Sequence, residues 1–589
     1  MIVGAKPEKW ISAYQAMKDN LSLDNDDLLG VFAASLRFNI DDIHSTASEA
    51  ITGSGDDKKC DVIILDKERK TAIVAQCYMS QKTRKSAPSN KASDLNTGMT
   101  WLLSTDLQDV PDAIRGHADE LRVSIQDGEI DQIHIWYVHN CPGSKNVEDE
   151  LAAVERTTKA LLKTYVDDQP VSIHAEEISS EKIEEFYKQA EQTIIVTESF
   201  NLKPFDAIEL EGHEWSSVVT VVDGAWLHDV YSRYGKDLFS ANLRGYLGSR
   251  STDSNIYNGI KKTVVEEPDN FSVYNNGITA LVLDYELDKR TRGGRKLRID
   301  GISIVNGAQT TGSIGSTESI APNTLRVPVR FVKAKKSSIV SNVVRFNNSQ
   351  NKLQAADFRS NDQIQERLRK EFDSIPAAEY EGGRRGGASD AIKRSKYALP
   401  SYPVAQALKA FHGDAISAYN EKSELWTNES LYRGIFTDRT TARHIVFCYS
   451  LLQCVNQLKA DLAKRRKVDA SSMTEADNSK LEFLTKKGAN YLIILSASKC
   501  IETIMGKPIT NRFDLKFSKN ESPADLSDFW SPIVDLFLSF SGQMDQCFSN
   551  NRISRENIES HHPVFVSIIS SLAVTHAATF EAFRNEVSA

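Results

Sequence analysis

Short apolar runs alternate with helix-like segments through the first third of the chain. In Asp24–Phe38 and Val110–Asp127 the apolar residues recur at helical spacing, which predicts amphipathic helices. The apolar runs Cys60–Leu65 and Thr71–Tyr78 lie on either side of a short polar break, and this pattern predicts a β-hairpin. Gln132–His139 predicts a further strand. This alternation predicts an α/β domain in which helices flank a mixed sheet.

Helical spacing dominates the last third of the chain. A polar stretch, Ala470–Ser479, predicts a linker between helices, and His561 and His562 are expected to lie in a loop before Pro563. We therefore expect an all-α C-terminal domain that supports the protein or mediates its oligomerisation. The segments with helical spacing are Tyr402–Phe411, Ala442–Leu462, Glu482–Met505, Pro532–Phe548 and Phe565–Glu586.

Three clusters of side-chain amides and hydroxyls follow short apolar runs in the middle of the chain. They are Tyr274–Thr279, Asn306–Thr311 and Asn347–Asn351. Buried amides must find hydrogen-bond partners, so the clusters either satisfy one another or converge on a ligand. The alternative is that they form turns, because two of them contain Asn-Gly, which commonly marks a β-hairpin.

The order of the motifs around these clusters resembles the abortive-infection phage-resistance (AIPR) family. The resemblance extends over about Phe205–Arg394 and implies an α+β central domain in an antiphage defence protein. The motifs are Leu238–Gly248 (LFSANLRGYLG), Asn255–Thr263 (NIYNGIKKT), Pro268–Thr279 (PDNFSVYNNGIT), Ile304–Thr311 (IVNGAQTT) and Arg345–Leu353 (RFNNSQNKL).

Two arginines accompany the amides, and their planar guanidinium groups suit a phosphate or a carboxylate. We expect this set to bind a nucleotide, a nucleic-acid backbone or another trigger. The candidate binding residues are Arg244, Asn275, Asn276, Asn306, Gln309, Thr310, Arg345, Asn348 and Gln350.

The hairpin in the first domain suggests a second site. When the hairpin is folded symmetrically about its polar break, Asp61 lies opposite Gln76. Directly opposed residues of an antiparallel pair project from the same face, so a carboxylate and an amide meet at one end of the hairpin.

This arrangement resembles the core of PD-(D/E)XK nucleases, in which an Asp and an acidic or amide residue on the next strand hold a divalent metal. Such nucleases carry a lysine two positions later, where this chain has Tyr78. The resemblance implies that Asp61 is catalytic and binds Mg²⁺ or Mn²⁺, that Gln76 shapes the metal site and that Asp57 assists. The candidates for the displaced lysine are Lys82 and Lys91, and Glu49 is a candidate further carboxylate.

Changes in the sequence pattern, together with the two resemblances, divide the chain into a nuclease-like domain at residues 1–199, an AIPR domain at 200–395 and a helical domain at 396–589. They imply an abortive-infection effector that cleaves DNA or RNA with a divalent metal. The alternative is a non-catalytic sensor or scaffold that binds nucleic acid, a nucleotide or a phage protein and signals to a partner enzyme. A phage-derived trigger, a defence partner protein and a homo-oligomer are the other expected partners.

Composition limits these hypotheses. The net charge of −9 argues against a protein that coats nucleic acid, although a basic cleft remains compatible with it. Arg326–Lys336 predicts a cationic strand, either part of such a cleft or a solvated edge strand. The seven scattered cysteines, the lack of a Walker A motif and the lack of a long apolar segment predict a cytoplasmic protein without a disulfide framework, Walker-type ATP hydrolysis or a membrane span.

Overall fold

The computed structural model describes most of the 589 residues. The described residues are 9–21, 26–38, 40, 43–52, 56–163, 171–191, 194, 196–204, 206–239, 254–288, 295–317, 320–335, 339, 343, 359, 362–382 and 397–588. The chain forms two compact units, one from residues 1–184 together with 354–589 and the other from residues 185–353. The N-terminal α/β region and the C-terminal helical region thus share one unit, which we call the composite unit.

A four-stranded mixed sheet forms the centre of the N-terminal α/β region, in the order β1-β2-β3-β4. Strands β1 and β2 form the predicted antiparallel hairpin, whereas β2, β3 and β4 run parallel. Residues on β2 and β3 are buried almost throughout, as expected for strands covered on both faces. The strands are β1 (Val62–Asp66), β2 (Thr71–Tyr78), β3 (Gln132–His139) and β4 (Ser172–Ile178).

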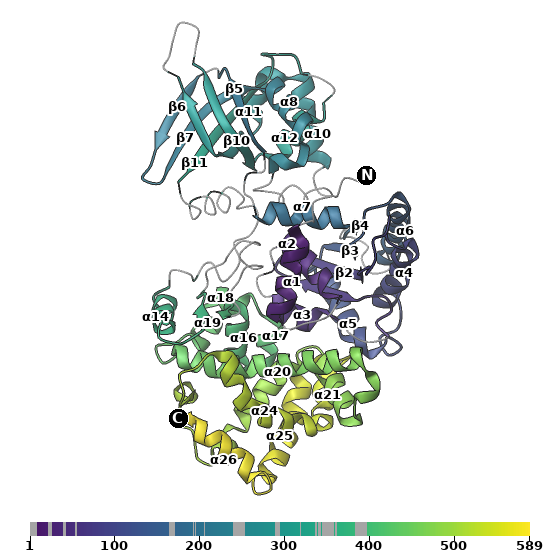
Figure 1. The fold of residues 1–589 in the computed structure, drawn as a ribbon, viewed down its shortest axis with the longest axis vertical. Coiled ribbons are helices and arrows are strands. Elements are labelled where there is room, and N and C mark those ends of the chain that lie inside the picture. The colour runs from purple at the N-terminus through teal and green to yellow at the C-terminus, as the bar shows by residue number, and fades with distance from the viewer. Residues whose placement is uncertain are drawn as a thin grey trace. The chain divides into compact units, whose positions relative to one another are not determined.

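Helices cover both faces of this sheet (Figure 1). One of them, α4, was not expected from the sequence because its polar residues obscure the apolar stripe made by Leu95, Met99 and Leu102. Helix α2 is buried along nearly its whole length and packs on β2 and β3. The helices are α1 (Lys9–Leu21), α2 (Leu28–Phe38), α3 (Ile43–Ala50), α4 (Ser89–Leu103), α5 (Asp112–Gln126), α6 (Lys145–Leu162) and α7 (Ser180–Glu191).

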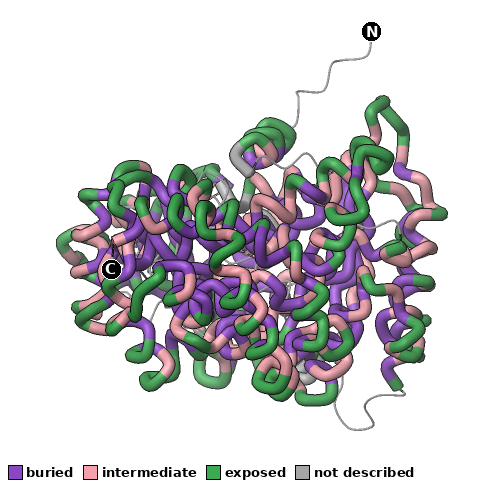
Figure 2. The backbone as a smooth tube through the Cα atoms, turned by 90° about the horizontal axis from the view of Figure 1, so that it is seen from below, coloured by how far each residue is buried: buried purple, intermediate pink, exposed green. Residues whose placement is uncertain are grey.

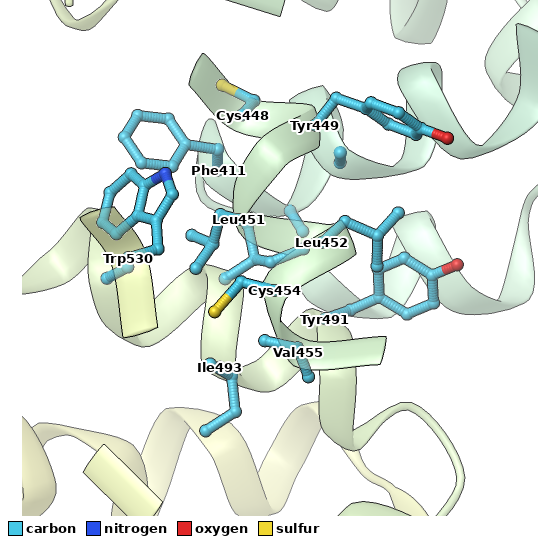
Figure 3. Packing of buried hydrophobic residues seen from close by; sticks show 14 of the residues in the cluster. Phe411, Cys448, Tyr449, Leu451, Leu452, Cys454, Val455, Tyr491, Ile493 and Trp530 are labelled. Atoms are coloured by element: carbon cyan, nitrogen blue, oxygen red, sulfur yellow. The ribbon is translucent and has the colours of Figure 1, made fainter. Parts of the chain in front are cut away.

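The C-terminal region is helical, as the sequence predicted, and its core surrounds α20. Figure 3 shows Phe411, Tyr491 and Trp530 packing around Leu451 and Leu452 of this helix. Exposed residues lie mainly on the outward turns of the helices (Figure 2). The longer helices are α14 (Gln363–Phe372), α16 (Ser401–Phe411), α20 (Ala442–Val468), α21 (Glu475–Thr485), α22 (Ala489–Lys499), α24 (Pro523–Ser539), α25 (Arg555–Ser571) and α26 (Ala577–Glu586).

Three expectations for this region are wrong. The predicted linker Ala470–Ser479 is only partly a linker, because α21 begins at Glu475, after the Thr474 N-cap. Helix α24 begins at Pro523, nine residues before the predicted start, because the Ser522 hydroxyl accepts from Asp525 N–H and Pro523 suits the first turn. His561 and His562 lie inside α25, which continues through Pro563. The His562 ring is buried and its Nε2 pairs with Ser496 Oγ at 2.8 Å, so this histidine serves packing.

The second unit is built on a seven-stranded sheet. Its order is β5-β10-β8-β11-β7-β6, with β9 beside β10; among the described strands of this sheet, β8 and β11 pair in parallel and the other pairs are antiparallel. The strands are β5 (Val196–Leu202), β6 (Ala207–Glu211), β7 (Trp215–Asp223), β8 (Ile278–Val282), β9 (Asp284–Leu287), β10 (Leu297–Asn306) and β11 (Arg326–Ala334). Helices α8 (Gly224–Tyr234), α10 (Ser254–Glu266), α11 (Phe271–Tyr274) and α12 (Ala308–Gly315) complete this mixed α and β unit.

Strand β11 is the predicted cationic strand, but it is not an edge strand. It lies between β8 and β7 and pairs with both along most of its length. The edge-strand interpretation is therefore wrong. Its charges have internal partners instead: Arg330 donates to Thr279 Oγ1 at 3.1 Å, and Lys333 pairs with Asp284 at 2.6 Å.

Candidate functional site

The hairpin places Asp61 and Gln76 together, as the sequence predicted. Val62 pairs with Ala75, and the same register puts Asp61, the residue before β1, opposite Gln76. The next backbone group on β2, Cys77 N–H, donates to Asp61 Oδ2 at 2.6 Å. This bond fixes the Asp61 carboxylate at the end of the hairpin where β2 finishes.

The buried side-chain oxygen of Gln76 has no hydrogen-bond partner among the described residues. This oxygen, Oε1, belongs to a side chain that is 3% exposed. The hydroxyl of Tyr137, the register neighbour of Gln76 on β3, is likewise buried without a partner among these residues. Because an unsatisfied buried polar atom is destabilising, two adjacent ones indicate a place for a bound ion, water or substrate atom.

The surroundings of Asp61 are strongly acidic. Burial, together with the negative charges of Asp27 and Asp57, raises the pKa of Asp61 to about 7. The Cys77 N–H bond and the positive charge of Lys91 act in the opposite direction. A carboxylate held in this way favours either a proton or a cation.

Asp27 is a member of this site that sequence reasoning missed. It lies immediately before α2, and its backbone carbonyl accepts from the Cys77 thiol at 3.6 Å. In the sequence it belongs to the polar start of the predicted helix Asp24–Phe38, which was expected only to form a helix. A helix as apolar as α2 must be buried, but the sequence does not show which strands it packs on or where it brings the residue before it.

Asp57 lies in a tight turn that leads into Asp61. Its carboxylate accepts from Lys59 N–H at 3.0 Å, while Lys58 and Lys59 both have positive φ angles. Helix α4 approaches this turn closely at Gly98, where a Cβ would lie 2.6 Å from Cys60 Sγ. The turn is thus held by its own bonds and by α4.

The two candidate lysines occupy different positions. Lys82 is exposed in the segment after β2, and nothing described connects it with Asp61. Lys91 is half-buried in the first turn of α4; its Nζ lies 5.5 Å from the ring centroid of Tyr78, and its charge acts on Asp61. Tyr78 stands at the position where a lysine was expected, and Lys91 from the neighbouring helix α4 places its positive charge near this position instead.

Glu49 does not join this site. Its carboxylate accepts from the Tyr491 hydroxyl at 3.3 Å, which directs it to the C-terminal helices. No three histidine, cysteine or acidic side chains among the described residues gather as a metal cluster. A cation here would depend on a mixed set of oxygens, the Asp61 carboxylate and the Gln76 amide foremost, and such oxygens suit Mg²⁺ or Mn²⁺.

The first two amide clusters of the second unit adjoin each other. Asn306 pairs with Thr279 between β10 and β8, and the turn at Gly307 packs on Gly277 and Ile278. Asn276-Gly277 joins α11 to β8, and Asn306-Gly307 joins β10 to α12, so the hairpin alternative is wrong.

The individual candidates in these clusters differ in exposure. Asn276 and Asn306 are exposed, Asn275 and Gln309 are half-buried, and Thr310 is buried. Arg244, Arg345, Asn348 and Gln350 lie outside the described residues, as does the third cluster.

Gly307 allows the close approach of these clusters. Its φ is 95°, and an added Cβ would lie 2.9 Å from Ile278 Cγ1. We expect Gly307→Ala to lower the free energy of unfolding of this unit by about 1–3 kcal/mol, because alanine resists this φ and meets the β8 backbone. Urea unfolding of the whole chain would measure the loss. Gly542→Ala, where nothing lies near an added Cβ, is the control.

The fold and the site define a protein that combines α/β units with a helical region and carries an acidic, partly buried polar site. The family model described as AIPR protein matches residues 239–513, somewhat less than half of the chain. This match supports the AIPR assignment and suggests a role in abortive infection against phage. No curated protein and no solved structure matches the chain. Within the described residues, no helix is long and apolar enough to cross a membrane.

Proposed function

We propose that this protein is an antiphage effector that cleaves nucleic acid with a divalent metal at Asp61. One observation carries the proposal: the hairpin register places Asp61 opposite Gln76, whose buried side-chain oxygen has no partner among the described residues, and the charges of Asp27, Asp57 and Lys91 act on the Asp61 carboxylate. The AIPR match supports the defence role. The nuclease activity rests on the geometry of the hairpin.

Each residue has a role in this proposal. Asp61 and Gln76 would hold Mg²⁺ or Mn²⁺, and Asp27 and Asp57 would add the negative charge that attracts it. A metal held there would activate water for attack and balance the charge of the scissile phosphate. Cys77 N–H keeps the Asp61 carboxylate in place. Lys91 provides a fixed positive charge for the phosphate during the transfer.

Cations around the site favour a nucleic-acid substrate in spite of the acidic chain. Lys59, Lys82, Arg84 and Lys85 are exposed on the two segments that adjoin the hairpin end. The Arg84 guanidinium carbon lies 5.9 Å from the ring centroid of Tyr78. Such a set of cations beside an acidic centre suits a phosphate backbone that is drawn over the metal site.

A cleavage assay with purified full-length protein tests this function. Labelled single- and double-stranded DNA and RNA are incubated with Mg²⁺, with Mn²⁺ or with EDTA. We expect cleavage of one of these substrate classes only in the presence of a metal. Calorimetry without substrate measures whether the wild-type protein binds Mn²⁺. If no cleavage is seen, binding of Mn²⁺ indicates an enzyme that lacks its trigger, whereas the lack of binding indicates that the site holds no metal.

The role of Lys91 is tested separately. We expect Lys91→Met to lower the cleavage rate by about 10²-fold, because a positioned charge at the reacting phosphate is lost from a partly buried site. Lys82→Met should lower the rate less than about threefold and mainly through KM, since Lys82 is exposed. Equal losses of kcat in the two variants would contradict the assignment of Lys91.

The sensor hypothesis is supported by a different feature, the junction at which Asn306, Thr279 and Arg330 meet on neighbouring strands of the second unit. A sensor would keep phage protection in cells with Asp61→Asn and lose it with Asn276→Ala or Asn306→Ala. The effector that we propose loses protection with Asp61→Asn.

A further inference from the structure

The end of helix α3 is held by two lysines from the C-terminal helical region. Lys459 of α20 donates from Nζ to Ser48 O, and Lys487 donates from Nζ to Glu49 O at 3.2 Å. His117 Nε2 of α5 donates to the same Glu49 carbonyl at 3.2 Å. These carbonyls belong to the last turn of α3, where carbonyl groups lack partners within the helix and cations are favourable.

The residues that follow α3 hold Asp61. Ile51 forms a bridge with Val62, Thr52 N–H donates to Asp61 O at 3.2 Å, and the Thr52 hydroxyl donates to Cys60 O at 2.9 Å. Only Ala50 and Ile51 separate the carbonyl that Lys487 binds from Thr52. A short, continuous path therefore leads from the two lysines to the backbone of the candidate catalytic residue.

The lysines are built into a close contact within the composite unit. Lys487 is 8% exposed, and its backbone is fixed by Asn551 O at 2.8 Å. Helix α5 comes so near that a Cβ on Gly116 would lie 2.9 Å from both Asn551 O and Lys487 Cγ. Figure 1 shows α3 beside α20.

Two buried ammonium groups at this contact are unfavourable by themselves. Burial and, to a smaller extent, the charge of Lys487 lower the pKa of Lys459 to about 8, with Glu49 acting against both effects. A purely supporting contact would be made more simply from apolar side chains. The presence of two lysines whose donors end on α3 carbonyls indicates that this contact fixes the position of that helix end.

We infer that Lys459 and Lys487 are positioning residues, through which docking of the C-terminal helices keeps Asp61 in its place beside Gln76. The catalytic consequence rests on the function proposed above, whereas the coupling itself does not. A partner or a change of state that lifts α20 from α3 would release Thr52 and disturb the site. The C-terminal region is then a regulator of the hairpin site.

Hydrogen exchange measured by mass spectrometry tests the coupling without any catalysis. In full-length protein, Lys459→Gln combined with Lys487→Met should speed exchange of the Thr52 and Cys77 amides by about tenfold, because the bonds they make to Asp61 open more often. Exchange in β3 and α22 should stay unchanged. Lys486→Met is the matched control, since Lys486 pairs with Asp545 at 2.6 Å within the C-terminal region.

Single variants keep the test decisive if the double variant does not fold. Lys459→Gln alone should speed exchange at Thr52, and Lys459→Arg, which retains a donor, should restore it. Unchanged exchange at Thr52 and Cys77 in folded Lys459→Gln, or acceleration spread equally over the whole unit, would overturn the inference. If the wild-type protein neither binds Mn²⁺ nor cleaves nucleic acid, the proposed function fails, but the exchange result still decides the coupling.

Discussion

Asp61→Asn is expected to lower metal-dependent cleavage by at least about 10³-fold. The substitution keeps an oxygen that can accept from Cys77 N–H, so the hairpin end retains its shape. It removes the carboxylate of the residue that the hairpin register places opposite Gln76, whose side-chain oxygen has no partner among the described residues. Loss of a charged metal ligand weakens both metal binding and the stabilisation of the transferring phosphate, and together these amount to about 4 kcal/mol or more. Initial rates at saturating Mn²⁺ measure the effect.

Asp66→Asn provides the control for this experiment on the same strand. Asp66 lies at the other end of β1, and its carboxylate binds Arg69 N–H at 3.0 Å together with the Arg69 guanidinium. Its loss should leave the rate per folded molecule within about twofold of the wild-type rate, because this carboxylate is remote from Gln76. A similar fall in both variants would mean that the hairpin supports the activity only by its fold.

Local features of the sequence were sufficient to predict the hairpin and its register. Thr71–Tyr78 and Gln132–His139 are strands with the expected bounds, because apolar runs of this length between polar breaks have few alternatives. The pairing of Asp61 with Gln76 followed from a short loop, which leaves little freedom in the register. The helical character of the C-terminal region was equally visible in its apolar spacing.

Contacts between distant parts of the chain could not be predicted in this way. Asp27 reaches the site only because α2 packs on β2, and Lys91 only because α4 covers the same sheet. The capping of α3 by Lys459 joins residues more than 400 positions apart. A single sequence records no such proximity, since composition and periodicity describe local order alone.

The amide motifs illustrate a different limit. Asn-Gly was expected to mark either a hairpin or a site, yet both copies join a helix and a strand. The requirement at Gly307 is a left-handed φ and room for Ile278, and neither is specific to a hairpin. Turn chemistry therefore identified where the chain changes direction, whereas the surrounding packing decided which elements it joins.

Asp61→Asn should also make the protein more stable at alkaline pH, which is the second large effect. The folded pKa of Asp61 is about 7, above the value of about 3.9 expected in an unfolded chain. Between these two pKa values, Asp61 loses its proton in the unfolded state but keeps it in the folded state. The free energy of unfolding therefore falls as the pH rises, and this loss of stability is complete above about pH 7. Asparagine has no such penalty and should stabilise the protein by about 2–4 kcal/mol near pH 8.

Urea unfolding of both proteins from about pH 5 to about pH 8 measures this difference, which should widen by about 2–3 kcal/mol over the range.

Asp66→Asn should show the opposite sign, because Arg69 outweighs burial and keeps the pKa of Asp66 below its ordinary value. That carboxylate contributes stability above its unfolded pKa and loses it as the pH falls, so its replacement destabilises at pH 8. Saturating Mn²⁺ should stabilise the wild-type protein and not Asp61→Asn. If Asp61→Asn is more stable but does not cleave, Asp61 destabilises the fold without a cation and is retained for function. If Asp61→Asn is less stable than the wild-type protein, Asp61 is instead a structural residue like Asp66.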